Sequence, residues 1–193
     1  MKKNTNKLTG VALLSALIVV LQLFAPAIKI GPYSMALSLI PIVVGAIIYG
    51  PGAGAILGAV CAAVIAICSI QGLDAGGFAM FQYKPVVTIL LIFAKTTLAG
   101  LAGGLAYKML KDKNELLAVY CCAVLVPVIN TGIFSLTVLT MFRELVCGWA
   151  EAAGISNVTS YVLFTLAGIN FLLEVLINIL LAPVVNRVIK ARG

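Results

Sequence analysis

Six long apolar segments follow one another along the chain, and they constrain the fold more than any other feature. Five have the length of about 17–25 residues or more that an α-helix needs to cross a bilayer, and the second is shorter. A membrane β-barrel would instead show short segments of alternating hydrophobicity. We therefore predict an all-α integral membrane protein, a bundle of six transmembrane helices. The predicted spans are residues 8–25, 35–49, 52–70, 85–107, 116–141 and 158–185.

Composition supports a single domain within the membrane. Hydrophobic residues make up 63% of the 193 residues, charged residues make up only 10%, and the mean hydropathy is +1.18. A soluble domain has about 45–50% apolar and about 25% charged residues. No linker or low-complexity segment interrupts the pattern, so residues 1–193 are predicted to form one membrane domain.

Basic residues predict the orientation of the helices. Positive residues concentrate in cytoplasmic loops of membrane proteins. Nine of the basic residues fall on one side of the predicted bundle and three on the other, which places both termini in the cytoplasm. The net charge of +7 is therefore read as a topology signal and not as evidence of nucleic-acid binding. The nine are Lys2, Lys3, Lys7, Lys108, Lys111, Lys113, Arg187, Lys190 and Arg192.

The N-terminal segment also resembles a secretory signal. Lys2 and Lys3 precede an apolar run, and Ala25-Pro26-Ala27 resembles a cleavage site. Removing this segment would leave five spans and would place one basic end outside. We therefore expect the first helix to be retained.

The chemistry of soluble enzymes and metal sites is missing from this sequence. Histidine is absent, the five cysteines have no metal-ligand spacing, and no Gly-x-x-x-x-Gly-Lys-Ser/Thr loop occurs. We predict no ATPase or other enzymatic activity, no cofactor and no metal. Four of the cysteines lie in predicted spans, where a thiol behaves as a small hydrophobe.

Small residues recur every four positions in several spans. Gly54 and Gly58 belong to such a series in the third span, and Ala99 and Gly103 to another in the fourth. This spacing lets helix backbones approach closely in lipid, so we expect packing within the bundle. Ala12 and Ala16 have the same spacing in the first span. There the stripe is also a candidate docking face for another membrane subunit.

Polar residues inside the spans are the candidate substrate site, because such groups are costly in a bilayer. They share faces of the fourth and sixth helices and follow a helix-loosening Pro127 in the fifth. Counted from the outer edge at about 1.5 Å per residue, they converge on an outer-to-middle zone with the residues before the fourth span at its mouth. The alternative is a buried Lys95–Glu174 pair that only fixes packing. The predicted site is Gln82, Tyr83, Lys84, Thr88, Lys95, Asn130, Thr131, Asn170 and Glu174.

These features together resemble one transporter family. The length, the six spans, the Ala12–Ala16 element and the sequences Ser38-Leu39-Ile40-Pro41 and Tyr49-Gly50-Pro51-Gly52 are similar to the substrate-binding S components of energy-coupling factor (ECF) vitamin transporters. The polar stretch before the fourth span and the segment from Pro127 to Gly132 add to the likeness. Each motif is weak alone, but their order is fairly specific and covers nearly the whole chain.

The resemblance implies a mechanism and partners. Such a subunit captures a vitamin or similar micronutrient from outside, then associates with a membrane coupling subunit and two cytoplasmic ATPase subunits, and topples to release the substrate inward. The substrate would lie near loop 29–34, segment 71–84 and the polar faces of the last three helices. Ala12 and Ala16 would dock on the coupling subunit.

The charges favour an anionic substrate, because Lys84, Lys95 and Arg143 outnumber acids near the outer zone. Pantothenate fits this best, with pyridoxine, hydroxymethylpyrimidine and niacin-like acids as other options. Two further classes stay open. One is a stand-alone secondary transporter or channel, although no inverted repeat is evident, and the other is a membrane enzyme or structural membrane protein.

Overall fold

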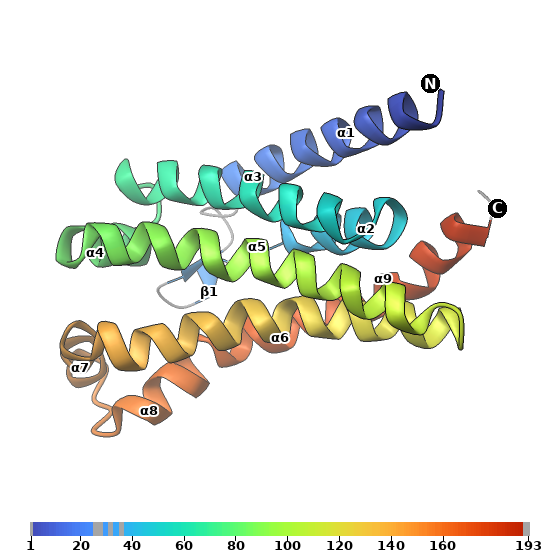
Figure 1. The fold of residues 1–193 in the computed structure, drawn as a ribbon. Coiled ribbons are helices and arrows are strands. Elements are labelled where there is room, and N and C mark those ends of the chain that lie inside the picture. The colour runs from blue at the N-terminus through green and yellow to red at the C-terminus, as the bar shows by residue number, and fades with distance from the viewer. Residues whose placement is uncertain (1, 25–28, 31–32, 35–36, 191–193) are drawn as a thin grey trace.

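The computed structural model describes residues 2–24, 29–30, 33–34 and 37–190, which form an elongated helical bundle (Figure 1). A two-residue antiparallel hairpin pairs Lys29 with Ser34 and Ile30 with Tyr33. The remaining elements are helices. In chain order they are α1 (Lys2–Phe24), β1 (Lys29–Ile30), β2 (Tyr33–Ser34), α2 (Leu39–Tyr49), α3 (Pro51–Ile70), α4 (Ala75–Tyr83), α5 (Pro85–Leu110), α6 (Glu115–Met141), α7 (Arg143–Ala152), α8 (Val158–Ser160), η2 (Tyr161–Leu166) and α9 (Gly168–Lys190).

Five helical segments of the described chain are long and apolar enough to cross a membrane. The prediction of a multi-pass, all-α membrane protein is confirmed at this level. The second predicted span, residues 35–49, contains α2, which begins only at Leu39 and is about 16 Å long at 1.5 Å per residue. The first two residues of that predicted span, 35 and 36, lie outside the described residues.

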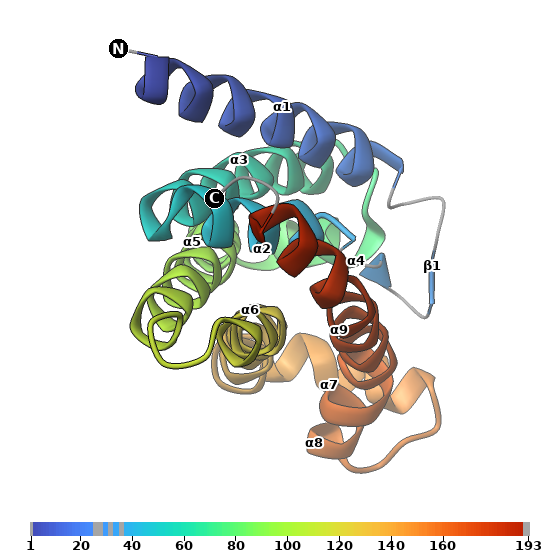
Figure 2. The same cartoon turned by 90° about the vertical axis from the view of Figure 1, so that its right-hand side faces the viewer.

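Helix α2 occupies the centre of the bundle. It contacts α1, α3, α5, α6 and α9, which surround it in the view of Figure 2. None of its residues is exposed, and Leu39, Ile42 and Ala46 are at most 1% exposed. A helix that is apolar all round is stable when it is enclosed by other helices, which explains how so short a helix belongs to the bundle.

Helices α3 and α5 make the most extensive helix–helix contact among the described residues, and glycine permits their close approach. A Cβ atom on Gly54 would lie 2.3 Å from the Gly100 carbonyl oxygen, and one on Gly58 would lie 2.3 Å from the Thr96 carbonyl oxygen. In each case the obstacle is backbone, which a rotamer change cannot move. The predicted packing role of the small residues in α3 is confirmed.

We predict that Gly58→Ala destabilises the protein by roughly 1–3 kcal/mol, the usual cost of overpacking. The added methyl group would collide with the α5 backbone and push the two helices apart. Gly52→Ala is the matched control on the same helix, because a Cβ there meets no atom within 4 Å. Thermal melts in detergent measure both variants, and equal melting points would contradict the packing account.

Two segments between the predicted spans contain helices, which lie at one end of the bundle (Figure 1). Helix α4 is capped by Asp74, whose side chain accepts a hydrogen bond from the Gly77 amide at 3.0 Å. Helix α7 buries Val146 and Ala150. Their apolar sides build a second core with α5, α6 and η2. This core contains Met80, Leu91, Val138, Phe142, Val146, Ala150, Tyr161, Val162 and Leu166.

The last predicted span is interrupted. It begins with α8, continues as the π-helix η2 and becomes an ordinary α-helix at Gly168. A Cβ atom on Gly168 would lie 2.7 Å from the Leu163 carbonyl oxygen. A residue larger than glycine would therefore clash with the backbone of the wide turn. Single π-helical turns within helices occur often at functional sites.

Both termini lie at the end of the bundle that also carries the α5–α6 connection, whereas α4 and α7 lie at the opposite end (Figure 1). The spatial arrangement therefore groups the basic segments at one end of the bundle.

Candidate functional site

Four of the predicted site residues are buried polar side chains on the three long helices that follow α4. Thr88 on α5 is 1% exposed, Asn130 on α6 is 5% exposed, and Asn170 and Glu174 on α9 are 8% and 6% exposed. These positions lie along the sides of the helices that face the bundle. Polar groups so deep in an apolar bundle are expensive without a role.

Lys95 of α5 reaches toward α6. Its Nζ atom lies 5.2 Å from the centroid of the Phe134 ring, an arrangement that attracts an ammonium to the ring face. Lys95 is also close enough to Glu174 for the two charges to interact. Phe134 lies one helical turn after Asn130, so these residues connect the polar sides of three helices.

Asn130 has the clearest unmet hydrogen-bonding capacity. Its Oδ1 atom is buried and has no hydrogen-bond partner in the part of the chain that the structure describes. A buried amide oxygen left without a partner costs roughly 1–3 kcal/mol. An arriving ligand with an N–H or O–H group would remove that cost.

Three further polar residues adjoin this zone, and sequence reasoning missed them. The Ser38 hydroxyl donates to Gln22 Oε1 at 2.9 Å and lies 3.2 Å from the Cys61 sulfur. Ser38 precedes α2 but makes no capping hydrogen bond with it. The Cys61 thiol, expected to act only as a small hydrophobe, instead belongs to a polar cluster that joins α1, α2 and α3. Its position near Lys95 and Glu174 places the cluster beside the predicted site.

Two of the residues predicted at the mouth of the site, Tyr83 and Lys84, form hydrogen bonds with residues at the junction of α6 and α7. Lys84 Nζ donates to the Met141 carbonyl at 2.7 Å, and the Tyr83 hydroxyl donates to Glu144. This second bond raises the pKa of the Tyr83 phenol, since it stabilises the protonated form. The junction of α4 with α5 is thus held against the junction of α6 with α7. Gln82 is exposed.

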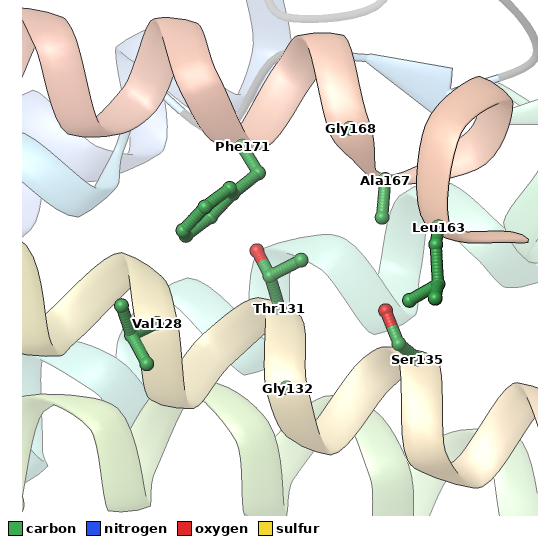
Figure 3. Close-up of a pocket in the computed structure, with 8 residues that line it drawn as sticks. All are labelled: Val128, Thr131, Gly132, Ser135, Leu163, Ala167, Gly168 and Phe171. Carbon is green, nitrogen blue, oxygen red and sulfur yellow. The ribbon is translucent and has the colours of Figure 1, made fainter.

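Thr131 faces a different space from Asn130. It lines a pocket of about 240 Å³ between α6 and the η2–α9 break, where Thr131 and Ser135 point their hydroxyl groups toward α9 (Figure 3). The other walls are mostly apolar and include Phe171 and Leu163. Asn130 does not line this pocket, because adjacent residues of a helix point about 100° apart. Thr88 is also directed elsewhere, since its hydroxyl donates to the Lys84 carbonyl at 2.9 Å.

The predicted docking residues, Ala12 and Ala16, are both exposed on α1. The opposite side of α1 packs on the bundle through fully buried Ile18 and through Gly10, where a Cβ would collide with the Tyr49 ring. Only 11% of the most apolar stretch of α1 is buried inside the structure. The small side chains of Ala12 and Ala16 therefore do not serve packing within the chain.

Comparison with known protein families supplies one further finding. A family model described as ECF transporter, substrate-specific component, matches residues 6–186. Comparisons with curated proteins and with solved structures found no match. The family match extends from α1 to the last turns of α9 and includes every residue of the predicted site.

Proposed function

The chain belongs to the family of substrate-specific components of ECF transporters, and from this premise we propose that it captures a small vitamin or related micronutrient outside a bacterial cell and delivers it inward. The family is one of substrate-binding transporter subunits and not of ATPases. The proposal is supported by the family match together with the buried polar side chains on α5, α6 and α9.

In this proposal residues 1–193 are one domain of six membrane helices in the plasma membrane. The short helix α2 counts as the second of the six and is enclosed by the others. Both termini and the Lys108–Lys113 segment face the cytoplasm, in keeping with the positive-inside rule. The end that carries α4 and α7 faces outside.

This orientation predicts which positions react with a membrane-impermeant thiol reagent in intact cells. Glu151→Cys, two residues after Trp149 at an exposed position, should be labelled, whereas Lys111→Cys should be labelled only after lysis. Peptide mass spectrometry locates each label and separates it from the native cysteines. Labelling of position 111 in intact cells would mean that this segment faces outside, and it would contradict the proposed topology.

We propose that the substrate binds in the outer-to-middle zone. Lys95 supplies charge, Asn130 and Asn170 supply hydrogen bonds, and Glu174 orients Lys95 or the substrate. Gln22, Ser38 and Cys61 extend the predicted set on the side of α1 and α3. Lys84 and Tyr83 hold the mouth in shape. Thr88, whose hydroxyl donates to the Lys84 carbonyl, and Thr131, which lines the neighbouring pocket, complete the proposed set.

A small anion with further polar groups suits this zone best. A cation in a dry site favours an anionic partner, and amide groups suit hydroxyl and amide functions on the same molecule. Pantothenate has this chemistry and is our first candidate substrate. Within the described residues, the aromatic contact of the Lys95 ammonium is with Phe134, and a single ring offers little stacking surface for a large flat substrate.

Transport would be powered by partners. We propose that the exposed Ala12–Ala16 side of α1 docks on a membrane coupling subunit, which in turn binds two cytoplasmic ATPase subunits. A stand-alone secondary transporter or channel is the competing function. Affinity purification of the tagged chain from its native membrane tests the choice. Recovery of two ATPases with an integral membrane partner supports the proposal, and uptake that continues in cells lacking those ATPases would favour the competitor.

A further inference from the structure

A polar pocket opens at the end of the bundle that carries both termini, away from the proposed substrate zone. It has a volume of about 310 Å³ and lies between the α2–α3 turn and the end of α5. Two lysines and two tyrosines contribute to its walls. The lining residues are Ile47, Ile48, Tyr49, Gly50, Pro51, Gly104, Tyr107, Lys108 and Lys111.

The backbone of the α2–α3 turn is open to a ligand. Gly104 of α5 sits so close to the turn that a Cβ there would lie 2.5 Å from the Pro51 Cα atom. By contrast, a Cβ on Gly50 or Gly52 would meet nothing within 4 Å. The turn is therefore held firmly against α5 from one side and left uncovered on the other.

The charge of the pocket is positive. Lys108 and Lys111 are exposed, and within the described residues neither ammonium group has a hydrogen bond or an ion pair. No acidic residue lines the pocket. Of the two acids nearby in sequence, Asp112 is exposed, and Glu115 interacts with the Tyr107 hydroxyl. Lysines near a helix C-terminus are favoured by the helix dipole, but that effect does not require a pocket between helices.

The depth of the pocket places it among lipid headgroups. Helix α5 has 26 residues, about 39 Å at 1.5 Å per residue, whereas the hydrocarbon core is about 30 Å thick. About 9 Å of α5 is thus left for the headgroup layers, and Lys108 and Lys111 favour the layer at its C-terminal end, because charged side chains are costly in the hydrocarbon core. Tyrosines are typical of this layer, and Ile47 and Ile48 form an apolar wall beside the charges.

We propose that this pocket binds the phosphate headgroup of an anionic phospholipid. Lys108 and Lys111 contact the phosphate, the uncovered Gly50–Gly52 turn allows close approach, and the isoleucines contact the start of an acyl chain. Basic pockets between membrane helices bind anionic headgroups in this way. The inference does not depend on which substrate the chain transports or on whether it transports one.

The test measures binding of a phosphatidylglycerol by native mass spectrometry of the purified full chain, with phosphatidylcholine as the neutral comparison lipid. The Lys108→Gln/Lys111→Gln double variant should bind phosphatidylglycerol about 10- to 30-fold more weakly than the parent, since each lysine near an anionic headgroup contributes a factor of about five. The control is Lys7→Gln/Lys113→Gln, which removes the same charge at the same end without touching the pocket.

Each outcome is decisive. A loss in the first double variant alone supports the proposal. Equal losses in both double variants would mean general attraction to basic residues, and no preference for phosphatidylglycerol over phosphatidylcholine would mean no anionic site. A final arm adds inorganic phosphate. Displacement of the lipid by low millimolar phosphate would assign the pocket to a soluble anion and overturn the lipid proposal.

Discussion

Lys95→Met is expected to weaken substrate binding by about 2–5 kcal/mol, the usual cost of removing one member of a buried charge pair. The fold-change in dissociation constant is about 30 to several thousand. The reason is that Lys95 is half-buried between helices, with its ammonium 5.2 Å from the centroid of the Phe134 ring and close to the buried polar groups of α6 and α9. The methionine side chain keeps the apolar length, so the melting point of the empty protein should change little.

A purely structural role for Lys95 predicts the opposite pattern. If the lysine only neutralises Glu174, Lys95→Met leaves a buried carboxylate uncompensated and lowers stability by about 3–5 kcal/mol. Glu174→Gln added to that variant would then restore much of the loss. Binding titrations and melts of both single variants and the double variant separate the two roles. Full ligand affinity in Lys95→Met would end the recognition hypothesis.

Ala12→Trp or Ala16→Trp is expected to abolish uptake while leaving substrate binding by the isolated chain nearly intact. Both alanines are exposed on α1, so a large side chain costs little within the protein. At a close helix–helix interface the same side chain would hold the coupling subunit away, because such interfaces depend on small residues. Uptake in cells and titrations with purified protein measure the two effects.

Leu136→Trp is the matched control for this pair, because Leu136 is an exposed membrane-facing residue of α6 at 66% exposure. It should leave both uptake and binding unchanged. An equal loss of binding and uptake in the α1 variants would mean that Ala12 and Ala16 serve internal packing, and the docking proposal would fail.

Much of the fold could be predicted from the sequence because a bilayer forces long apolar segments into helices. The limits of the predicted spans 52–70, 85–107 and 116–141 lie within three residues of the ends of α3, α5 and α6, whereas α1 begins six residues before the predicted span. The small-residue spacing of Gly54 and Gly58 also predicted a close helix contact. The partner of that contact, the α5 backbone at Thr96 and Gly100, could not be named, because the spacing of residues on one helix does not specify the helix that packs on it.

The helices α4 and α7 were missed for a different reason. Both are short, and their stability comes from packing on the second core rather than from a long periodic pattern. Asp74, which caps α4, was the one local signal that could have indicated a helix start. The π-helix η2 had no recognisable signal, since its residues read as an ordinary apolar span.

The candidate site could be predicted where a charged or amide side chain stands in a long apolar segment, as at Lys95, Asn130 and Glu174. It could not be predicted where common residues acquire a role through neighbours distant in sequence. Ser38 and Cys61 are 23 residues apart and meet at 3.2 Å, and neither residue type is unusual in an apolar helix. The separation of Thr131 from Asn130 likewise follows from helix rotation and the break before Gly168.

The most direct test of the central claim is mass spectrometry of small molecules released from the chain after purification from its native membrane. The account predicts one water-soluble micronutrient in near-stoichiometric amount, present in the parent protein and in Ala16→Trp but strongly depleted in Lys95→Met. Release of no such compound from the parent protein after growth in medium rich in vitamins, or equal amounts from the parent and Lys95→Met, would contradict substrate capture at this site.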